Sequence, residues 1–203
     1  MKSLLDYIKQ YNINESISNN IKEQFDNIYK SYQTLLSNND IKPVDVDETK
    51  LSKGKDSFEK DDLKDESLKQ VITNKSFGFV VASQMIGNVN KYFNDGDKEL
   101  KPTCYPYFYN DGTNEYCVGL LMYDEDVTYI DNFVTLISIE PSLCVTKALT
   151  VNKGILNDFC ESMKDKYDGI VVKPVHPRLK AIFTQLGFRT FSDNKEFLTL
   201  KLK

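Results

Sequence analysis

The sequence predicts an α/β (α+β) domain in which a mixed central sheet is flanked by helices and preceded by an N-terminal helical extension. The first reason is the order of segments from residue 115 to the end: strand, strand, helix, strand, short helix, strand. The second is composition, since 40% hydrophobic and 28% charged residues among 203 are enough to build a core. The third is a change of composition near residue 70, where a charged stretch with few apolar residues gives way to apolar segments. We therefore divide the chain into an N-terminal amphipathic helical segment over 1–40, a charged linker over 41–70 and a domain over 71–203.

Residues 1–40 are predicted to be helical, with Asn14 as a cap. Apolar residues recur there at three- and four-residue steps and form one stripe along the helix. Such a stripe must be buried, either on the rest of the chain or on a partner, which can be another protein subunit or a second copy. The predicted partner-binding residues are Ile17, Ile21, Phe25, Ile28, Tyr32 and Leu36.

The segment 41–70 has mixed charge, few apolar residues and both Pro43 and Gly54. These features predict a flexible linker or an exposed, weakly helical stretch, and no functional site. As a tether, the segment would let the striped helix reach a partner.

The segments after residue 70 predict the elements of the domain. Residues 77–86 read as a strand or the start of a buried helix, and Asn-Asp-Gly at 110–112 predicts a hairpin turn before a buried strand at 117–123. The remaining predicted elements are a turn at 125–127, a strand at 128–141, a helix at 144–167, a strand at 168–175, a short helix at 176–188 closed by Gly187, and last strands at 189–191 and 196–202.

Over residues 77–203 this order resembles the C-terminal core of the GCN5-related N-acetyltransferase (GNAT) superfamily. Three patterns carry the resemblance: the paired strands CVGLLMY and YIDNFVTLISIEP, the strand DGIVVKPV, and the stretch RLKAIFTQLGFRTF. In the third, Gly187 and Phe188 stand in register with the family's Gly-Phe signature. The resemblance implies a GNAT-like sheet with a V-shaped opening between two central parallel strands, contributed here by VTLISIE and GIVVKPV.

The turn that binds acetyl-CoA in active members departs from the family pattern here. The resemblance implies glycines between the proline-ending strand and the long helix, where backbone amides hold the pyrophosphate. In this chain Cys144, the β-branched Val145 and Lys147 fall in that turn, and Gly154 comes too late. We therefore expect no cofactor; if acetyl-CoA binds, these three turn residues and Ile139 in the preceding strand would contact it.

The residues expected for proton transfer depart as well. The resemblance implies a tyrosine four residues before the glycine of the signature, where this chain has Phe183, which has no proton to donate. Asp131 and Glu140 are the acids of the preceding strand, and each is either a base or a strand-end carboxylate. His176 reads as a loop or cap residue, although a pair with a cysteine stays open. The sequence contains no other catalytic motif, so we assign no catalytic residue.

Net charge, hydropathy and cysteine spacing limit the classes of partner and the cellular compartments that we expect for this protein. A net charge of -4 argues against general nucleic-acid binding, and no apolar run reaches the ~20 residues of a membrane span. The start MKSLLDYIKQY lacks the apolar stretch of a signal peptide, so we expect a cytoplasmic or virion protein. Cys104, Cys117, Cys144 and Cys160 lack zinc-ligand spacing and are expected to be free thiols, without a metal.

Two functions remain open. The missing glycines and tyrosine favour a catalytically degenerate GNAT-like protein that serves as a structural or interaction component of a larger assembly. Arg178 and Arg189 are the only arginines, which indicates an A+T-rich genome and makes a phage virion protein one candidate. The alternative is a divergent acetyl-CoA-dependent N-acetyltransferase that relies on backbone contacts, orientation and a bound water.

Overall fold

The structure of the chain, a computed structural model, describes residues 44–55, 57, 102–142, 145–174 and 177–203. The predicted helix over 1–40, with its partner-binding residues, and the segment at 77–86 lie outside these ranges, as do Cys144 and His176. The boundaries proposed at residues 40 and 70 therefore stay predictions.

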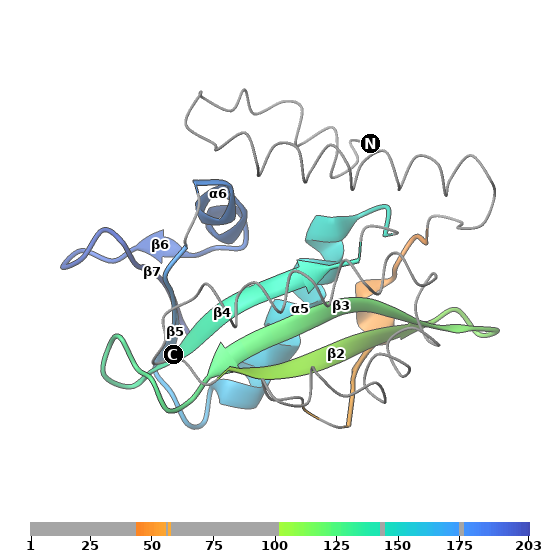
Figure 1. Ribbon diagram of the computed structural model, residues 1–203, viewed down its shortest axis with the longest axis horizontal. Helices are drawn as coiled ribbons and strands as arrows, with labels where there is room; N and C mark the ends of the chain where they lie inside the picture. The colour runs from red at the N-terminus through yellow and green to blue at the C-terminus, as the bar shows by residue number, and fades with distance from the viewer. Residues whose placement is uncertain (1–43, 56, 58–101, 143–144, 175–176) are drawn as a thin grey trace.

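The described residues form a seven-stranded mixed sheet with the order β1-β2-β3-β4-β5-β7-β6. Its elements are η1 (Glu48–Lys50), β1 (Leu51–Lys53), β2 (Thr103–Asn110), β3 (Glu115–Asp124), β4 (Phe133–Pro141), α5 (Ala148–Met163), β5 (Gly169–Val172), α6 (Pro177–Gln185), β6 (Arg189–Thr190) and β7 (Leu198–Lys201). Figure 1 shows β2, β3 and β4 side by side, with α5 behind them and α6 near the β5–β7 end. The predicted fold class, a mixed sheet flanked by helices, is confirmed.

The sheet consists of two antiparallel parts that one parallel pairing joins. Phe133, Val134 and Thr135 of β4 pair with residues 169–171 of β5, and every other neighbouring pair of strands is antiparallel. Beyond Thr135, β4 continues to Pro141 with only β3 as its partner among the described strands. The parallel pairing ends there because β5 itself ends at Val172, one residue beyond its last paired residue.

One hydrophobic cluster holds α5 against the sheet. Apolar residues recur along α5 at three- and four-residue steps, and Val151, Ile155 and Phe159 are fully buried. Burying each such side chain contributes about 1.5–3 kcal/mol. The cluster reaches from Tyr107 in β2 to Leu198 in β7. Leu149 is 40% exposed because it lies at the margin of the apolar stripe.

Two predicted turns are confirmed by their backbone geometry. In the β2–β3 hairpin Gly112 has a φ of 96°, and the Asp111 carboxylate accepts hydrogen bonds from the amides of Thr113 and Asn114. After α6, Gly187 has a φ of 99°, a conformation that favours glycine and ends the helix.

Several predicted elements are shorter in the structure. The strand expected at 128–141 begins only at Phe133, because residues 128–132 form a turn that ends with Asn132 at a φ of 62°. The helix expected at 144–167 begins at Ala148, after an isolated bridge at Val145, and ends at Met163. The strand expected at 168–175 is confined to residues 169–172, and the last strands to 189–190 and 198–201.

The expectation of an exposed or flexible linker is wrong for residues 44–53. Val46 is buried, and β1 extends the sheet by pairing with β2 from Leu51↔Tyr109 to Lys53↔Tyr107. Val44 and Val46 are separated by one residue, so both side chains lie on the same side of an extended segment. This pattern is only three residues long, and the surrounding charged residues favoured the prediction of a linker. We call Val44–Lys53 the strap; Figure 1 shows it in orange beside the start of α5.

The parallel junction generates the first testable prediction. A methyl group on Gly169 would lie 2.2 Å from Cε1 of Phe133 and 2.8 Å from the backbone oxygen of Leu200. The phenyl ring can turn away but the backbone oxygen cannot, so we expect Gly169→Ala to lower the free energy of unfolding by about 2–3 kcal/mol in urea denaturation.

Gly112→Ala is the matched control for this substitution. Nothing lies within 4 Å of a methyl group there, so only the positive φ opposes it and a cost of about 1 kcal/mol is expected. Equal losses in the two variants would show that space at the β4–β5 junction is not limiting.

Candidate functional site

The candidate site is the turn between β4 and α5, where the resemblance would place the pyrophosphate of acetyl-CoA. The turn contains Val145 and Lys147, and Cys144 lies outside the described residues. Val145 is only 5% exposed and belongs to the hydrophobic cluster, so its side chain is part of the core. Lys147 is the N-cap residue of α5 and makes no side-chain cap bond to the helix. The turn therefore places a buried valine before α5, and the side chain of its N-cap residue does not cap the helix.

The strap covers this turn. Val44 forms a parallel β-bridge with Val145, and the amide of Thr146 donates a hydrogen bond of 3.0 Å to the carbonyl oxygen of Val44. The hydroxyl of Thr146 donates to the same oxygen at 3.3 Å. A backbone donor that a phosphate would need is thus already paired within the chain.

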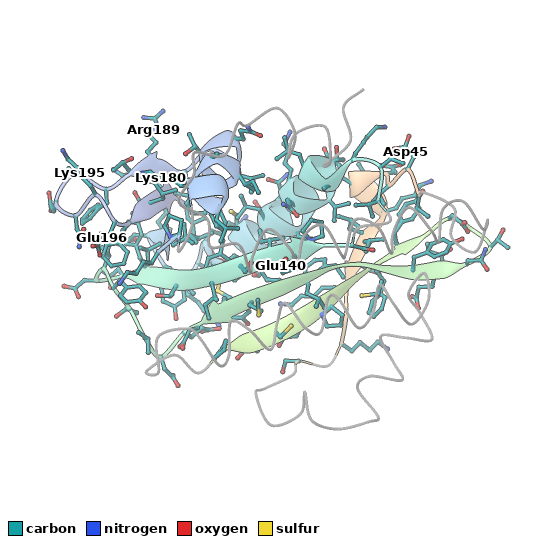
Figure 2. The ribbon with its side chains drawn as sticks, turned by 45° about the horizontal axis from the view of Figure 1, so that its top comes forward. Asp45, Glu140, Lys180, Arg189, Lys195 and Glu196 are labelled. Carbon is teal, nitrogen blue, oxygen red and sulfur yellow. The ribbon has the colours of Figure 1, made fainter. Side chains whose placement is uncertain are left out.

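The strap also neutralises the cation of the turn. Nζ of Lys147 lies 2.7 Å from Oδ1 and 2.9 Å from Oδ2 of Asp45, whose position on the strap Figure 2 shows. This hydrogen bond to Lys147 holds the pKa of the Asp45 carboxyl below its usual range. Because a negative charge is favourable near a helix N-terminus, Asp45 supplies there the charge that an anionic ligand would bring.

Gly154 has a structural role beside the strap. A methyl group on Gly154 would lie 2.5 Å from Cδ1 of Leu51 and 3.2 Å from Cβ of Glu48. The glycine therefore lets η1 and β1 approach the flank of α5. The glycine that comes too late for a phosphate-binding turn serves the segment that covers the turn.

Ile139 lies in β4, beyond the three residues that pair with β5. The amide of Ser142 donates to the carbonyl oxygen of Val118 in β3, so by strand alternation the backbone groups of Ile139 point away from β3. Its side chain is buried in the same hydrophobic cluster as Val145 and Phe183. All three therefore contribute side chains to one hydrophobic cluster.

Phe183 is a core residue of α6. It is 2% exposed, and its ring contacts that of Phe188 edge to face, with 5.3 Å between the ring centres. The backbone also joins the two residues, because the amide of Phe188 donates to the carbonyl oxygen of Phe183. The position that the resemblance assigns to a proton donor is thus filled by an apolar ring.

The two candidate bases lie apart. Asp131 is exposed in the turn before β4, outside the strand to which the sequence assigned it. Glu140 is half-buried in β4 and accepts a hydrogen bond of 2.7 Å from the hydroxyl of Ser138. It pairs with Leu120, next to Gly119, whose missing side chain would point at α5, so Glu140 lies on the opposite face of the sheet.

Cys104, Cys117 and Cys160 form no disulfide, as predicted. Burial raises the pKa of the Cys104 thiol to about 12 and that of Cys160 to about 11, so both stay protonated at neutral pH. Within the described ranges no group of side chains could hold a metal ion, and no helix is long and apolar enough to cross a membrane.

The structure thus brings Val145 and Lys147 together with the strap, a partner that the sequence did not assign to them. Val44 and Asp45 are separated from the turn by about a hundred residues, and local patterns do not report such contacts. The Val-x-Val spacing was the one signal that could have indicated a buried strap.

The ion pair at the turn generates the second prediction. In Lys147→Gln the Asp45 carboxylate loses its cation, so we expect its pKa to rise toward the ordinary carboxyl range in an NMR pH titration. Since the pKa of Asp45 is lowered in the fold, the pair stabilises the protein above that range and this contribution disappears as the pH falls through it.

Asp47 is an internal control in the same titration. Hydrogen bonds from Thr49 lower the pKa of its carboxyl, and these do not involve Lys147. An Asp45 pKa that is unchanged in Lys147→Gln would contradict the described contact between strap and turn.

Among known proteins, it is solved structures that match this chain. No family model and no curated protein matches the sequence. The chain is similar to solved structures of AtaTR bound with AcCoA (15% identity, 76% of this chain and 94% of the other, TM-score 0.40) and of the AtaT-AtaR complex bound to DNA (12%, 60% and 79%, 0.41). It is also similar to the spermidine/spermine N-acetyltransferase SpeG from Vibrio cholerae (12%, 76% and 95%, 0.40). What these proteins bind is a property of those proteins alone.

Proposed function

We propose that this chain is a catalytically degenerate GNAT-like protein that does not use acetyl-CoA and serves as a structural or interaction component of a larger assembly. The observation that carries the proposal is the strap over the β4–α5 turn, in which Val44 pairs with Val145 and Asp45 with Lys147.

The residues present do not fit the pyrophosphate of acetyl-CoA. A pyrophosphate needs free backbone amides and positive charge at a helix N-terminus. The amide of Thr146 is bonded to Val44, and the charge of Lys147 is neutralised by Asp45. A bound phosphate would in addition meet the like charge of Asp45, and both terms oppose binding at this turn.

The surroundings supply no replacement for a catalytic acid. Phe183 is an apolar core residue, and the thiols of Cys104 and Cys160 are held in their protonated form by burial. These observations support the proposal that neither the residue at position 183 nor these two thiols acts as a catalytic acid.

An interaction role would explain the apolar stripe of the predicted N-terminal helix. The predicted striped helix with Ile17, Phe25 and Leu36 would dock on another subunit or a second copy, while the GNAT-like domain acts as a rigid body. The A+T-rich composition makes a phage particle one assembly in which such a component would serve.

The alternative, a divergent acetyl-CoA-dependent N-acetyltransferase, is favoured by one observation. The second half of β4 has no β5 residue opposite it among the described strands, and the backbone of Ile139 points away from β3, so an acyl-chain ligand could hydrogen-bond to it without a particular side chain. Glu140 would then be the base to test. A displaced strap is the change that this alternative requires.

Acetyl-CoA binding by the whole protein tests the proposal directly. Calorimetric titration with acetyl-CoA up to millimolar concentration is expected to give only the heat of dilution, and the melting temperature is expected to stay constant. An active acetyltransferase titrated in the same buffer verifies the ligand. Saturable binding at micromolar concentration, or release of CoA in a screen of amines, would establish the alternative instead.

A second test concerns the position of the missing acid. In Phe183→Tyr the new hydroxyl would be buried beside Phe188 without a partner, so we expect a loss of about 1–3 kcal/mol in unfolding free energy and no CoA release. Phe197→Tyr is the matched control, since Phe197 is half-buried and its hydroxyl can reach water. A Phe183→Tyr protein that gains acetyl transfer would count against the proposal.

A further inference from the structure

Charge is distributed unevenly along the chain. The last 27 residues, 177–203, contain six cations and two carboxylates, which gives +4, although the whole chain carries -4. The preceding 176 residues therefore carry -8. Both arginines of the protein belong to the cationic part. An asymmetry of this size indicates a surface that recognises charge.

The tertiary structure gathers three of these cations at one end of the molecule. Lys180 of α6, Arg189 of β6 and Lys195 of the β6–β7 loop are exposed, and Figure 2 shows them together at the opposite end from Asp45. None of the three makes an ion pair within the part of the chain that the structure describes. We call these three residues the basic end surface.

The frame that carries the basic end surface is held in place. Arg189 pairs with Thr199 across β6 and β7. In the loop, the amide of Phe191 donates to the carbonyl oxygen of Phe197, whose ring packs on Tyr129 with 4.9 Å between the ring centres. Because the backbone is already ordered, a partner would not have to immobilise it on binding.

The neighbouring carboxylates limit the type of partner. Glu196 lies 3.8 Å from Lys173 and is compensated by it, whereas Asp193 adds a negative charge within the loop. Three cations interrupted by carboxylates are too few for the six to ten phosphate contacts typical of duplex binding. They suit a short row of carboxylates, and the guanidinium of Arg189 can hold one of them with two hydrogen bonds.

We propose that the basic end surface, formed by Lys180, Arg189 and Lys195, is a docking site for an acidic segment of a partner protein. This inference rests on the proposed function, since it names the chemistry of the partner that an interaction component would bind. The surface lies away from the strap, so the docking site and the inert turn are separate parts of the molecule (Figure 2).

The test uses the full chain and a fluorescent ten-residue oligoglutamate peptide. Anisotropy titrations at low and high salt are expected to show binding that weakens as salt rises. Replacing all three cations, as Lys180→Gln, Arg189→Gln and Lys195→Gln together, is expected to weaken binding about tenfold or more. The matched control is the triple variant Lys50→Gln, Lys55→Gln and Lys153→Gln, which removes the same charge from exposed lysines elsewhere and should change the affinity by less than about twofold.

Each outcome bears on the docking site. Absence of peptide binding at low salt, or equal weakening in the two triple variants, overturns it, and so does tighter binding of an oligothymidylate of equal charge. Sedimentation without peptide identifies one special case: if the basic-end triple variant abolishes self-association and the control does not, the acidic partner is a second copy, which supports the docking site.

The same proteins separate this inference from the proposed function. Acetyl-CoA titration reports on the strap and the turn, which none of the basic-end substitutions touches. Saturable acetyl-CoA binding together with peptide binding overturns only the degenerate-enzyme proposal. If the protein binds neither the peptide nor acetyl-CoA, only the docking site is overturned.

Discussion

Three residue pairs between β4 and β5 join the two antiparallel parts of the sheet. At this junction Gly169 lies against Phe133 and the backbone of β7, with no room for a side chain. The second half of β4 has no β5 residue opposite it among the described strands, and buried residues of the β4–α5 turn and of α6 belong to the same hydrophobic cluster as α5. The three parallel pairs therefore fix how the part with β1, β2, β3 and β4 lies against the part with β5, β7 and β6.

The turn before α5 shows how contacts within a chain can take the place of a ligand. A helix start offers amides and a favourable field for negative charge, and here the strap provides both a carbonyl acceptor through Val44 and a carboxylate through Asp45. Gly154 lets η1 and β1 approach the helix closely. One segment thus contributes a buried apolar residue, Val46, a backbone acceptor and a charge of opposite sign beside the start of α5.

A surface at the other end of the molecule has the opposite character. Around the turn the charges are paired, whereas Lys180, Arg189 and Lys195 are exposed on an ordered frame without ion pairs among the described residues. The separation of the two regions lets either be altered by mutation with little effect on the other.

The sequence by itself determined the order of elements from β3 to β7, the hairpin turn at Gly112 and the helix end at Gly187, because periodicity and backbone preference are local properties. It also placed Val145 and Lys147, rather than glycines, in the turn before α5. The strap and the role of Gly154 were decided only by the tertiary structure. Val44 reaches Thr146 because the fold brings together segments about a hundred residues apart, and no local pattern encodes which segments meet.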